Sequence, residues 1–82
     1  MDERDAIMML LGQRGPERSI CPSEAARLVL GEDGWREAME PVREAGRALA
    51  AEGLILVTQK GSAVDPATAR GPIRYRLRET ND

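Results

Sequence analysis

The second half of the chain, residues 41–78, constrains the fold more than any other part. Residues 41–52 have the apolar spacing of a helix, which ends at Gly53. An apolar run over residues 54–58 follows directly and predicts a strand that is covered by helices. After a polar loop with Gly and Pro, residues 73–78 alternate between apolar and basic side chains, as in a strand with one buried face. These residues therefore predict a helix followed by a β-hairpin.

Two shorter helical patterns precede this unit. The first covers residues 2–13 and is ended by Gly15-Pro16. The second covers residues 22–30, with Pro22 at the first position, where its missing N–H is not needed, and it ends at Gly31. Between them, residues 19–20 are expected to form a short extended piece beside the sheet. The predicted apolar faces of these two helices are Ala6, Ile7, Leu10 and Leu11 in the first, and Ala25, Ala26, Leu28 and Val29 in the second.

The third helical pattern contains a proline, which leaves its beginning open. The apolar arc continues across Pro41 back to Trp35, yet a proline inside a helix clashes with the carbonyl four residues earlier, here that of Glu37. Either the helix is kinked from about Trp35, or a short turn at 34–39 leads to a fresh helix near Glu40. The second alternative is favoured, because helices accept proline at their first position. In both alternatives Trp35 is expected to fill the core as its one large anchor.

Together the elements predict a single domain over residues 1–82, with flexible ends at about 1–2 and 79–82. A chain of 82 residues supports one small core. The fold class is α+β and mostly helical. The order of the elements is that of a winged helix-turn-helix, with three helices plus a two- or three-stranded antiparallel wing sheet.

The residue inventory argues against several classes of function. There is one cysteine, Cys21, and no histidine, so an internal disulfide and a Cys/His zinc site are both excluded. No metal or cofactor is expected. Cys21 has no obvious base and the carboxylates lie in helical ion-pair settings, so we do not expect an enzyme or any catalytic residue. Low cysteine use and the lack of a signal peptide favour a cytoplasmic protein, and no apolar run approaches the roughly 20 residues that span a membrane.

The charges are unevenly distributed, although the net charge is only −2 and the isoelectric point is about 5.2. Residues 1–33 carry four arginines against seven acids, a net charge of −3. Residues 60–78, here called the wing, carry five basic residues against Asp65 alone, a net charge of +4. The wing is therefore a local positive patch on an acidic body.

Several short motifs are spread along the chain: Cys21-Pro22-Ser23-Glu24-Ala25-Ala26-Arg27, Trp35-Arg36, Met39, Val42-Arg43, Thr58-Gln59-Lys60-Gly61, Asp65-Pro66 and Arg70-Gly71-Pro72-Ile73-Arg74. With these residues, the stretch from about Ile7 to Leu77 resembles one family of small, uncharacterised bacterial proteins. The family is known as a domain of unknown function placed among winged-helix folds, so the resemblance implies that fold and implies no activity.

The first candidate site is the exposed face of the third helix, where Arg36, Arg43 and Arg47 project on one flank. Arg43 and Arg47 are expected to approach the major groove of DNA and Arg36 a flanking phosphate. The alternative is a solvated face neutralised by its own acids. Three- and four-residue spacings predict that Glu40 pairs with Arg36 and Arg43, and that Glu44 pairs with Arg47, with Glu37 beside them.

The second candidate site is the wing. Its basic residues are expected to contact the DNA backbone. The alternative is an edge strand whose outward charges prevent aggregation, with Arg70 paired to Asp65 to close the loop. The wing residues are Lys60, Arg70, Arg74, Arg76 and Arg78.

Cys21 is the third candidate. It precedes Pro22 at a predicted helix start, which is a setting that favours a reactive thiolate. A lone thiol there could sense oxidants, but a lone cysteine is more often a small buried apolar residue.

Two functions remain open. The first is a transcriptional regulator or accessory factor that binds double-stranded DNA through helix 41–52 and the wing 60–78, with affinity dominated by the wing. The second is a protein-interaction module or homodimerising adaptor, for which Met8 and Met9 exposed together on the first helix would provide the surface.

Overall fold

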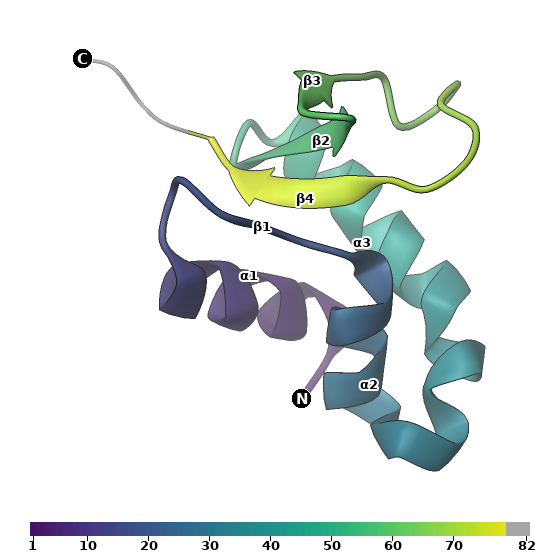
Figure 1. Cartoon of the computed structure of the whole chain (residues 1–82). Helices are drawn as coiled ribbons and strands as arrows, with labels where there is room; N and C mark the ends of the chain where they lie inside the picture. The colour runs from purple at the N-terminus through teal and green to yellow at the C-terminus, as the bar shows by residue number, and fades with distance from the viewer. Residues whose placement is uncertain (79–82) are drawn as a thin grey trace.

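The computed structural model describes residues 1–78, and helices and a small antiparallel sheet form its two layers (Figure 1). The class is α+β and mostly helical, as the sequence predicts. The predicted flexible end at 79–82 lies outside the described residues. In chain order the elements are α1 (Glu3–Arg14), β1 (Ser19–Ile20), α2 (Pro22–Gly34), the 3-10 helix η1 (Trp35–Ala38), α3 (Met39–Ala51), β2 (Ile55–Gln59), β3 (Ser62–Ala63) and β4 (Arg74–Leu77).

The helices differ from the predicted three separate ones. The helical elements from Pro22 to Ala51 adjoin one another, so the described chain has two helical stretches, α1 and α2–η1–α3. The second stretch bends at Gly31, whose φ of 79° and ψ of 178° are not helical, and again at η1. Gly31 is where the second helix was predicted to end. Glycine accepts this positive φ because it has no Cβ.

Pro41 lies in the first turn of α3, which begins at Met39. The N–H groups of a first turn have no carbonyl partner within the helix, so the proline ring removes no hydrogen bond there. The preceding residues form η1. The structure thus combines the two alternatives: α3 begins at Met39, close to the predicted fresh start near Glu40, but it follows η1 without a break, as a kinked helix from Trp35 would.

The sheet has four strands in the order β1-β4-β2-β3, rather than the predicted two or three. β2 and β4 are antiparallel, with Val57 opposite Tyr75, and β1 pairs with the other edge of β4, where Ile20 faces Tyr75. The extra strand, β3, follows a two-residue turn. Lys60 and Gly61 both have positive φ, at 51° and 83°, which is the geometry that folds a hairpin back tightly.

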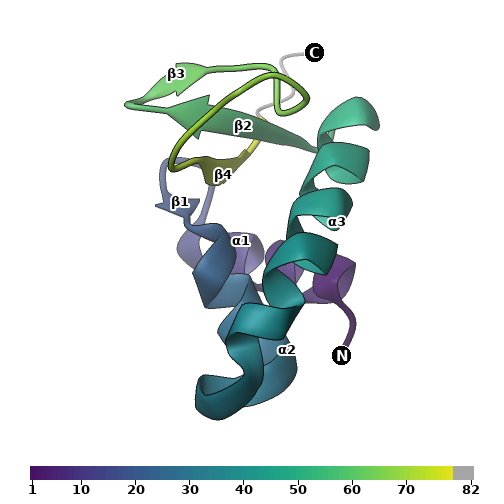
Figure 2. The same ribbon diagram turned by 90° about the vertical axis from the view of Figure 1, so that its right-hand side faces the viewer.

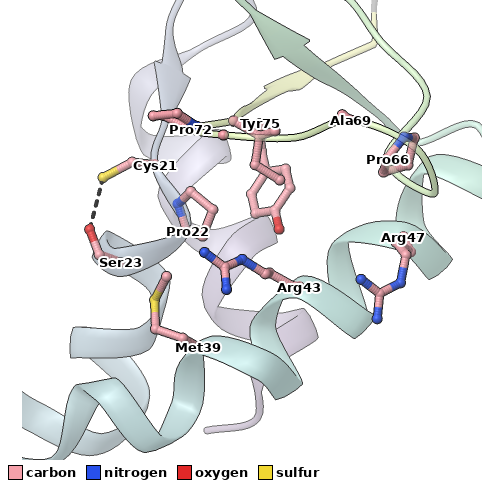
Figure 3. Close-up of a pocket in the computed structure, with 12 residues that line it drawn as sticks. Cys21, Pro22, Ser23, Met39, Arg43, Arg47, Pro66, Ala69, Pro72 and Tyr75 are labelled. Atoms are coloured by element: carbon pink, nitrogen blue, oxygen red, sulfur yellow. Dashed lines mark hydrogen bonds between the residues drawn. The ribbon is translucent and has the colours of Figure 1, made fainter.

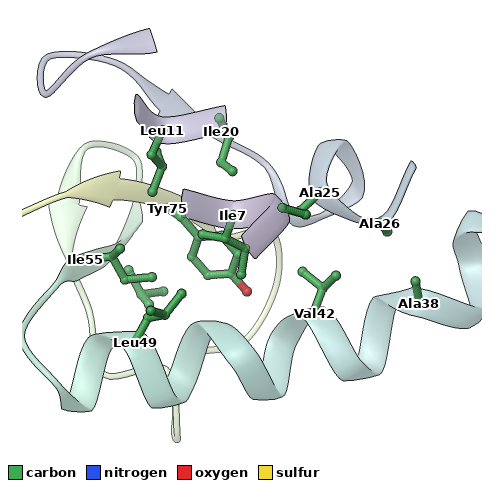
Figure 4. Close-up of a cluster of buried hydrophobic side chains, with 12 residues drawn as sticks. Ile7, Leu11, Ile20, Ala25, Ala26, Ala38, Val42, Leu49, Ile55 and Tyr75 are labelled. Atoms are coloured by element: carbon green, nitrogen blue, oxygen red, sulfur yellow. The ribbon is translucent and has the colours of Figure 1, made fainter. Parts of the chain in front are cut away.

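The core lies between the sheet and the helices (Figure 4). Its largest fully buried side chain is Tyr75. Trp35 was predicted to be the anchor, but it is only partly buried, and Arg27 and Arg36 lie over its ring at 4.4 and 4.5 Å from the ring centre. Trp35 is at a bend between helices, where it packs beside the core and not within it. Leu28 is also misplaced by the helical pattern, since it is 42% exposed.

Tyr75 packs directly on Gly46 of α3. A Cβ added at Gly46 would lie 2.5 Å from the Tyr75 hydroxyl oxygen and 2.6 Å from Cζ. No real side chain tolerates such contacts, so only glycine allows the tyrosine ring to approach the α3 backbone this closely. Gly46 is therefore a packing residue inside a helix.

Replacing Gly46 by Ala is expected to lower the free energy of unfolding by about 1–3 kcal/mol, because overpacking outweighs the better helix propensity of alanine. Gly12→Ala is the matched control. Gly12 is also in a helix, but nothing lies within 4 Å of an added Cβ, so this change should stabilise by about 0.5–1 kcal/mol. Urea unfolding measures both variants. Equal effects of the two substitutions would contradict the close contact between Gly46 and Tyr75.

Candidate functional site

An open groove of about 530 Å³ lies where the first turn of α2, the outer side of α3 and the loop between β3 and β4 meet. Figure 2 shows this loop at one end of the molecule, and Figure 3 shows the side chains that line the groove. Most of the lining is apolar. The lining residues are Cys21, Pro22, Ser23, Met39, Arg43, Arg47, Pro66, Ala69, Gly71, Pro72, Ile73 and Tyr75.

Arg43 and Arg47 bring the positive charge to this groove. They lie one helical turn apart on α3, both are exposed, and both guanidinium groups border the groove (Figure 3). Within residues 1–78, Arg43 forms no ion pair. Arg47 Nη2 lies 3.6 Å from Glu40 Oε1, and both of these side chains are largely in solvent. Such an exposed pair contributes little and can exchange for another anion.

The ion pairs predicted along this face of α3 are wrong, because the acids do not pair with the predicted arginines. Glu40 pairs with Arg47 across two turns, and no pair joins Glu40 to Arg36 or Arg43, or Glu44 to Arg47, in the described chain. Arg36 belongs to η1, before α3 begins, so the helical spacing between residues 36 and 40 does not apply. Its guanidinium lies over the Trp35 ring instead.

The loop before β4 is held without the predicted pair between Arg70 and Asp65, which is not formed among the described residues. Asp65 Oδ1 accepts a hydrogen bond from the Ala67 N–H at 2.9 Å, and the Asp65 carbonyl accepts one from the Ala69 N–H at 2.8 Å. Gln59 Nε2 donates to the Arg70 carbonyl at 2.5 Å and to the Pro72 carbonyl at 3.3 Å. Gln59 is part of a sequence motif, but its role in holding this loop depends on carbonyls more than ten residues away.

Arg74 and Arg76 have partners that the sequence analysis missed. Arg74 donates from Nε to Ser19 Oγ at 2.6 Å and from Nη2 to the Ser19 carbonyl at 3.0 Å. Arg76 Nε donates to the Pro16 carbonyl at 3.0 Å. Because neighbouring side chains of a strand alternate, both lie on the face of β4 opposite the buried Tyr75. They fasten the connection between α1 and β1 to the sheet.

The structure therefore divides the residues that the sequence placed in one DNA-binding set. Arg43 and Arg47 border the groove, and the exposed Arg70 lies in the loop beside it. Lys60 is in the tight turn between β2 and β3, and Arg36 is at the bend before α3. Arg74 and Arg76 lie on the other face of the sheet, with Arg78 following at the end of β4.

The Tyr75 hydroxyl is buried and has no hydrogen-bond partner among residues 1–78. Figure 3 shows it directed toward α3, near Arg43. Burial raises the pKa of Tyr75 to about 12, against a smaller lowering by Arg43 and Arg47. At neutral pH it is therefore a protonated donor that lacks an acceptor. Such a group is uncommon in a folded protein and calls for an explanation.

Cys21 lies at the edge of the groove, immediately before α2, and is partly buried. Its backbone N–H donates to Glu24 Oε2 at 2.8 Å, and its Sγ lies 3.1 Å from Ser23 Oγ. The Glu24 carboxylate also accepts from Arg14 Nη2 at 2.5 Å, and this hydrogen bond lowers the pKa of Glu24. Cys21 is thus the N-cap residue of α2, and Glu24 holds the first turn of this helix.

Within the described chain, residues 1–78, no group of three Cys, Asp or Glu side chains is placed to hold a metal ion. Over the same residues, no helix has the length and apolar character needed to cross a membrane.

The burial of Tyr75 predicts a loss of stability at alkaline pH. Its pKa is about 12 when folded and close to 10 when unfolded, so the unfolded chain releases this proton first as the pH rises. The stabilising contribution is complete below pH 10 and should be lost by about 2–3 kcal/mol as the pH approaches 12. Tyr75→Phe should show a smaller decline over this range and should be at least as stable at pH 7. Urea unfolding at several pH values measures both, and identical pH profiles would contradict the burial of the hydroxyl.

A search of curated proteins finds no match to this sequence. A family described as "Protein of unknown function (DUF3253)" matches residues 2–78, which is nearly the whole chain and includes α3, the groove and the wing through Arg78. The chain therefore belongs to the DUF3253 family.

Proposed function

We propose that this domain is a winged helix-turn-helix that binds double-stranded DNA through α3 and the loop between β3 and β4. The order of the elements supports the proposal: α2 and α3 are joined by the short η1, and a β-hairpin follows α3. In helix-turn-helix proteins the second helix of the motif lies in the major groove. Here that helix is α3.

The observation that carries this proposal is the position of Arg43 and Arg47. Both are exposed on one flank of α3, between the first turn of α2 and the loop before β4 (Figure 3). Arginine is the residue that most often binds guanine or phosphate with two hydrogen bonds.

The acids of α3 limit the affinity. Glu37, Glu40 and Glu44 are exposed near the two arginines, and the isoelectric point is about 5.2. We therefore expect weak binding by one domain, with a steep dependence on salt. One module of this size buries only about 600–1,000 Å² on DNA, so useful affinity requires a second copy or a partner.

The hydrogen bonds of Arg74 and Arg76 change which basic residues matter most. Since these two side chains are engaged with the Ser19 and Pro16 carbonyls, we no longer expect the wing to dominate the affinity. The proposal assigns the main contacts to Arg43 and Arg47. Three further exposed residues contact phosphates at the periphery: Arg36, Lys60 and Arg70.

Replacing Arg43 and Arg47 together by Ala should remove up to two phosphate contacts. The logarithm of the DNA affinity falls linearly with the logarithm of the salt concentration, and this salt slope should become shallower by up to about 1.8. The measurement is fluorescence anisotropy with a labelled duplex of random sequence at several salt concentrations. Arg18→Ala, an exposed arginine in the turn after α1, is the control and should leave the slope unchanged. If the wild-type domain does not bind at about 100 µM in low salt, which is weaker than ordinary non-specific binding, the proposal is wrong.

Replacing Arg74 and Arg76 together by Ala tests the structural role of this pair. The loss of their hydrogen bonds to residues 16–19 should lower the free energy of unfolding by about 1 kcal/mol, because these bonds are exposed. The salt slope should change less than in the Arg43/Arg47 variant. A larger loss of DNA affinity than in that variant would restore the model in which the wing dominates.

The second candidate function, a homodimer or adaptor without DNA binding, depended on Met8 and Met9 being exposed together. Met9 is 43% exposed, but Met8 packs against the core, so the predicted surface is not formed. Sedimentation at a protein concentration of about 100 µM tests this alternative directly, because this concentration is well above the dissociation constant of a stable dimer. A strictly monomeric protein would rule out the homodimer.

A further inference from the structure

The groove between α2, α3 and the loop before β4 combines two kinds of lining. The loop between β3 and β4 contributes the apolar residues Pro66 and Pro72. α3 contributes the apolar Met39 together with the basic Arg43 and Arg47. With a volume of about 530 Å³, the groove is within the range of small-molecule sites, which are mainly apolar with a few polar groups that fix the orientation of the ligand.

The Tyr75 hydroxyl gives the groove a third polar group. Tyr75 lines the groove, is fully buried, and has no acceptor for its hydroxyl proton among residues 1–78. Leaving a buried donor without a partner is unfavourable, and phenylalanine would fill the same space without this penalty. A tyrosine here is explained if a bound molecule supplies the acceptor.

We propose that the groove binds a small organic anion, whose oxyanion contacts Arg43, Arg47 and the Tyr75 hydroxyl while its apolar body packs against Met39, Pro66 and Pro72. The two guanidinium groups select for negative charge. The hydroxyl selects for an oxygen acceptor, and the apolar side chains of the lining select against a bare ion. The site does not depend on DNA binding, but it uses the same two arginines, so the anion and DNA compete.

A phosphate of the DNA backbone fits the groove less well than a compact organic anion. It has no apolar body to pack against Met39 and the two prolines. The Tyr75 hydroxyl exposes less than 1 Å² in this structure, so an acceptor reaches it only after a neighbouring side chain moves. The hydroxyl packs against the α3 backbone at Gly46, with Arg43 near it (Figure 3). Arg43 is exposed, so its side chain is the one that we expect to move. A small ligand can then enter where a duplex cannot.

Nuclear magnetic resonance tests this site directly, because the chain has one tyrosine and no phenylalanine. The Tyr75 ring signals are therefore assigned without ambiguity and report on the groove. The probes are benzoate and phenyl phosphate, with neutral benzyl alcohol and inorganic phosphate as the comparison. Benzoate or phenyl phosphate should shift the ring signals saturably, with a dissociation constant on the order of 1 mM for ligands of this size. The two comparison compounds should bind at least about tenfold more weakly, since each lacks the charge or the apolar body.

Variants connect this binding to the named groups. Tyr75→Phe should weaken benzoate binding about tenfold or more, measured from backbone amide shifts in residues 66–73, because a hydrogen bond to a charged acceptor is lost. Arg43→Gln should weaken it by a similar factor. Arg18→Gln, which removes one positive charge away from the groove, should leave the affinity unchanged. Thermal unfolding of each variant verifies that it is folded.

Two results would overturn the proposal: no saturable shift of Tyr75 with about 10 mM of either aromatic anion, a concentration well above the expected dissociation constant, or equal affinity in Tyr75→Phe and the wild type. Failure of this inference is distinguishable from failure of DNA binding. A protein that binds the duplex but not the aromatic anions retains only the DNA proposal, whereas one that binds the anions but not the duplex retains only this site. If both bind, benzoate should displace the labelled duplex.

Discussion

The contact between Tyr75 and Gly46 determines how the sheet lies on the helices. Tyr75 sits in the central part of the sheet, opposite Ile20 of β1 and Val57 of β2, and its ring rests on the α3 backbone where glycine leaves room. The rest of the core, including Val42 and Leu49 from α3, is arranged around this ring (Figure 4). The same contact places the tyrosine hydroxyl beside the groove. Packing and the candidate site therefore depend on one pair of residues.

Much of the architecture could be predicted from residue patterns. The helix, strand, loop and returning strand of residues 41–78 were recognisable because their periodicities differ and glycines separate them. The patterns could not predict which of the two aromatic residues is buried more deeply. Trp35 and Tyr75 both lie on apolar faces, but periodicity gives only a face, and the depth of each side chain depends on what packs opposite. Gly46 opposite Tyr75 decided that outcome, and it resembled an ordinary member of the apolar arc.

The candidate site was predictable only in part. The exposed arginines of α3 follow from helical spacing, and the structure brings Arg43 and Arg47 to one groove. The partners of Arg74 and Arg76 could not be foreseen, because the accepting carbonyls are 55 and 60 residues earlier in the chain. The groove itself also depends on tertiary structure, since α2, α3 and the loop before β4 meet there. A count of positive charge over the wing could not separate basic residues that hold the fold together from basic residues that border a groove.

The helical stretch from Pro22 to Ala51 contributes two sides of the groove, the first turn of α2 and the flank of α3. It departs from α-helical geometry at two places between them, Gly31 and η1. We therefore expect any change in the spacing of these two sides to occur at the two bends. The single indole of the protein, Trp35, belongs to η1, and the guanidinium groups of Arg27 and Arg36 lie over its ring. Widening of the groove should therefore alter the environment of Trp35, and the fluorescence of this residue should report the motion.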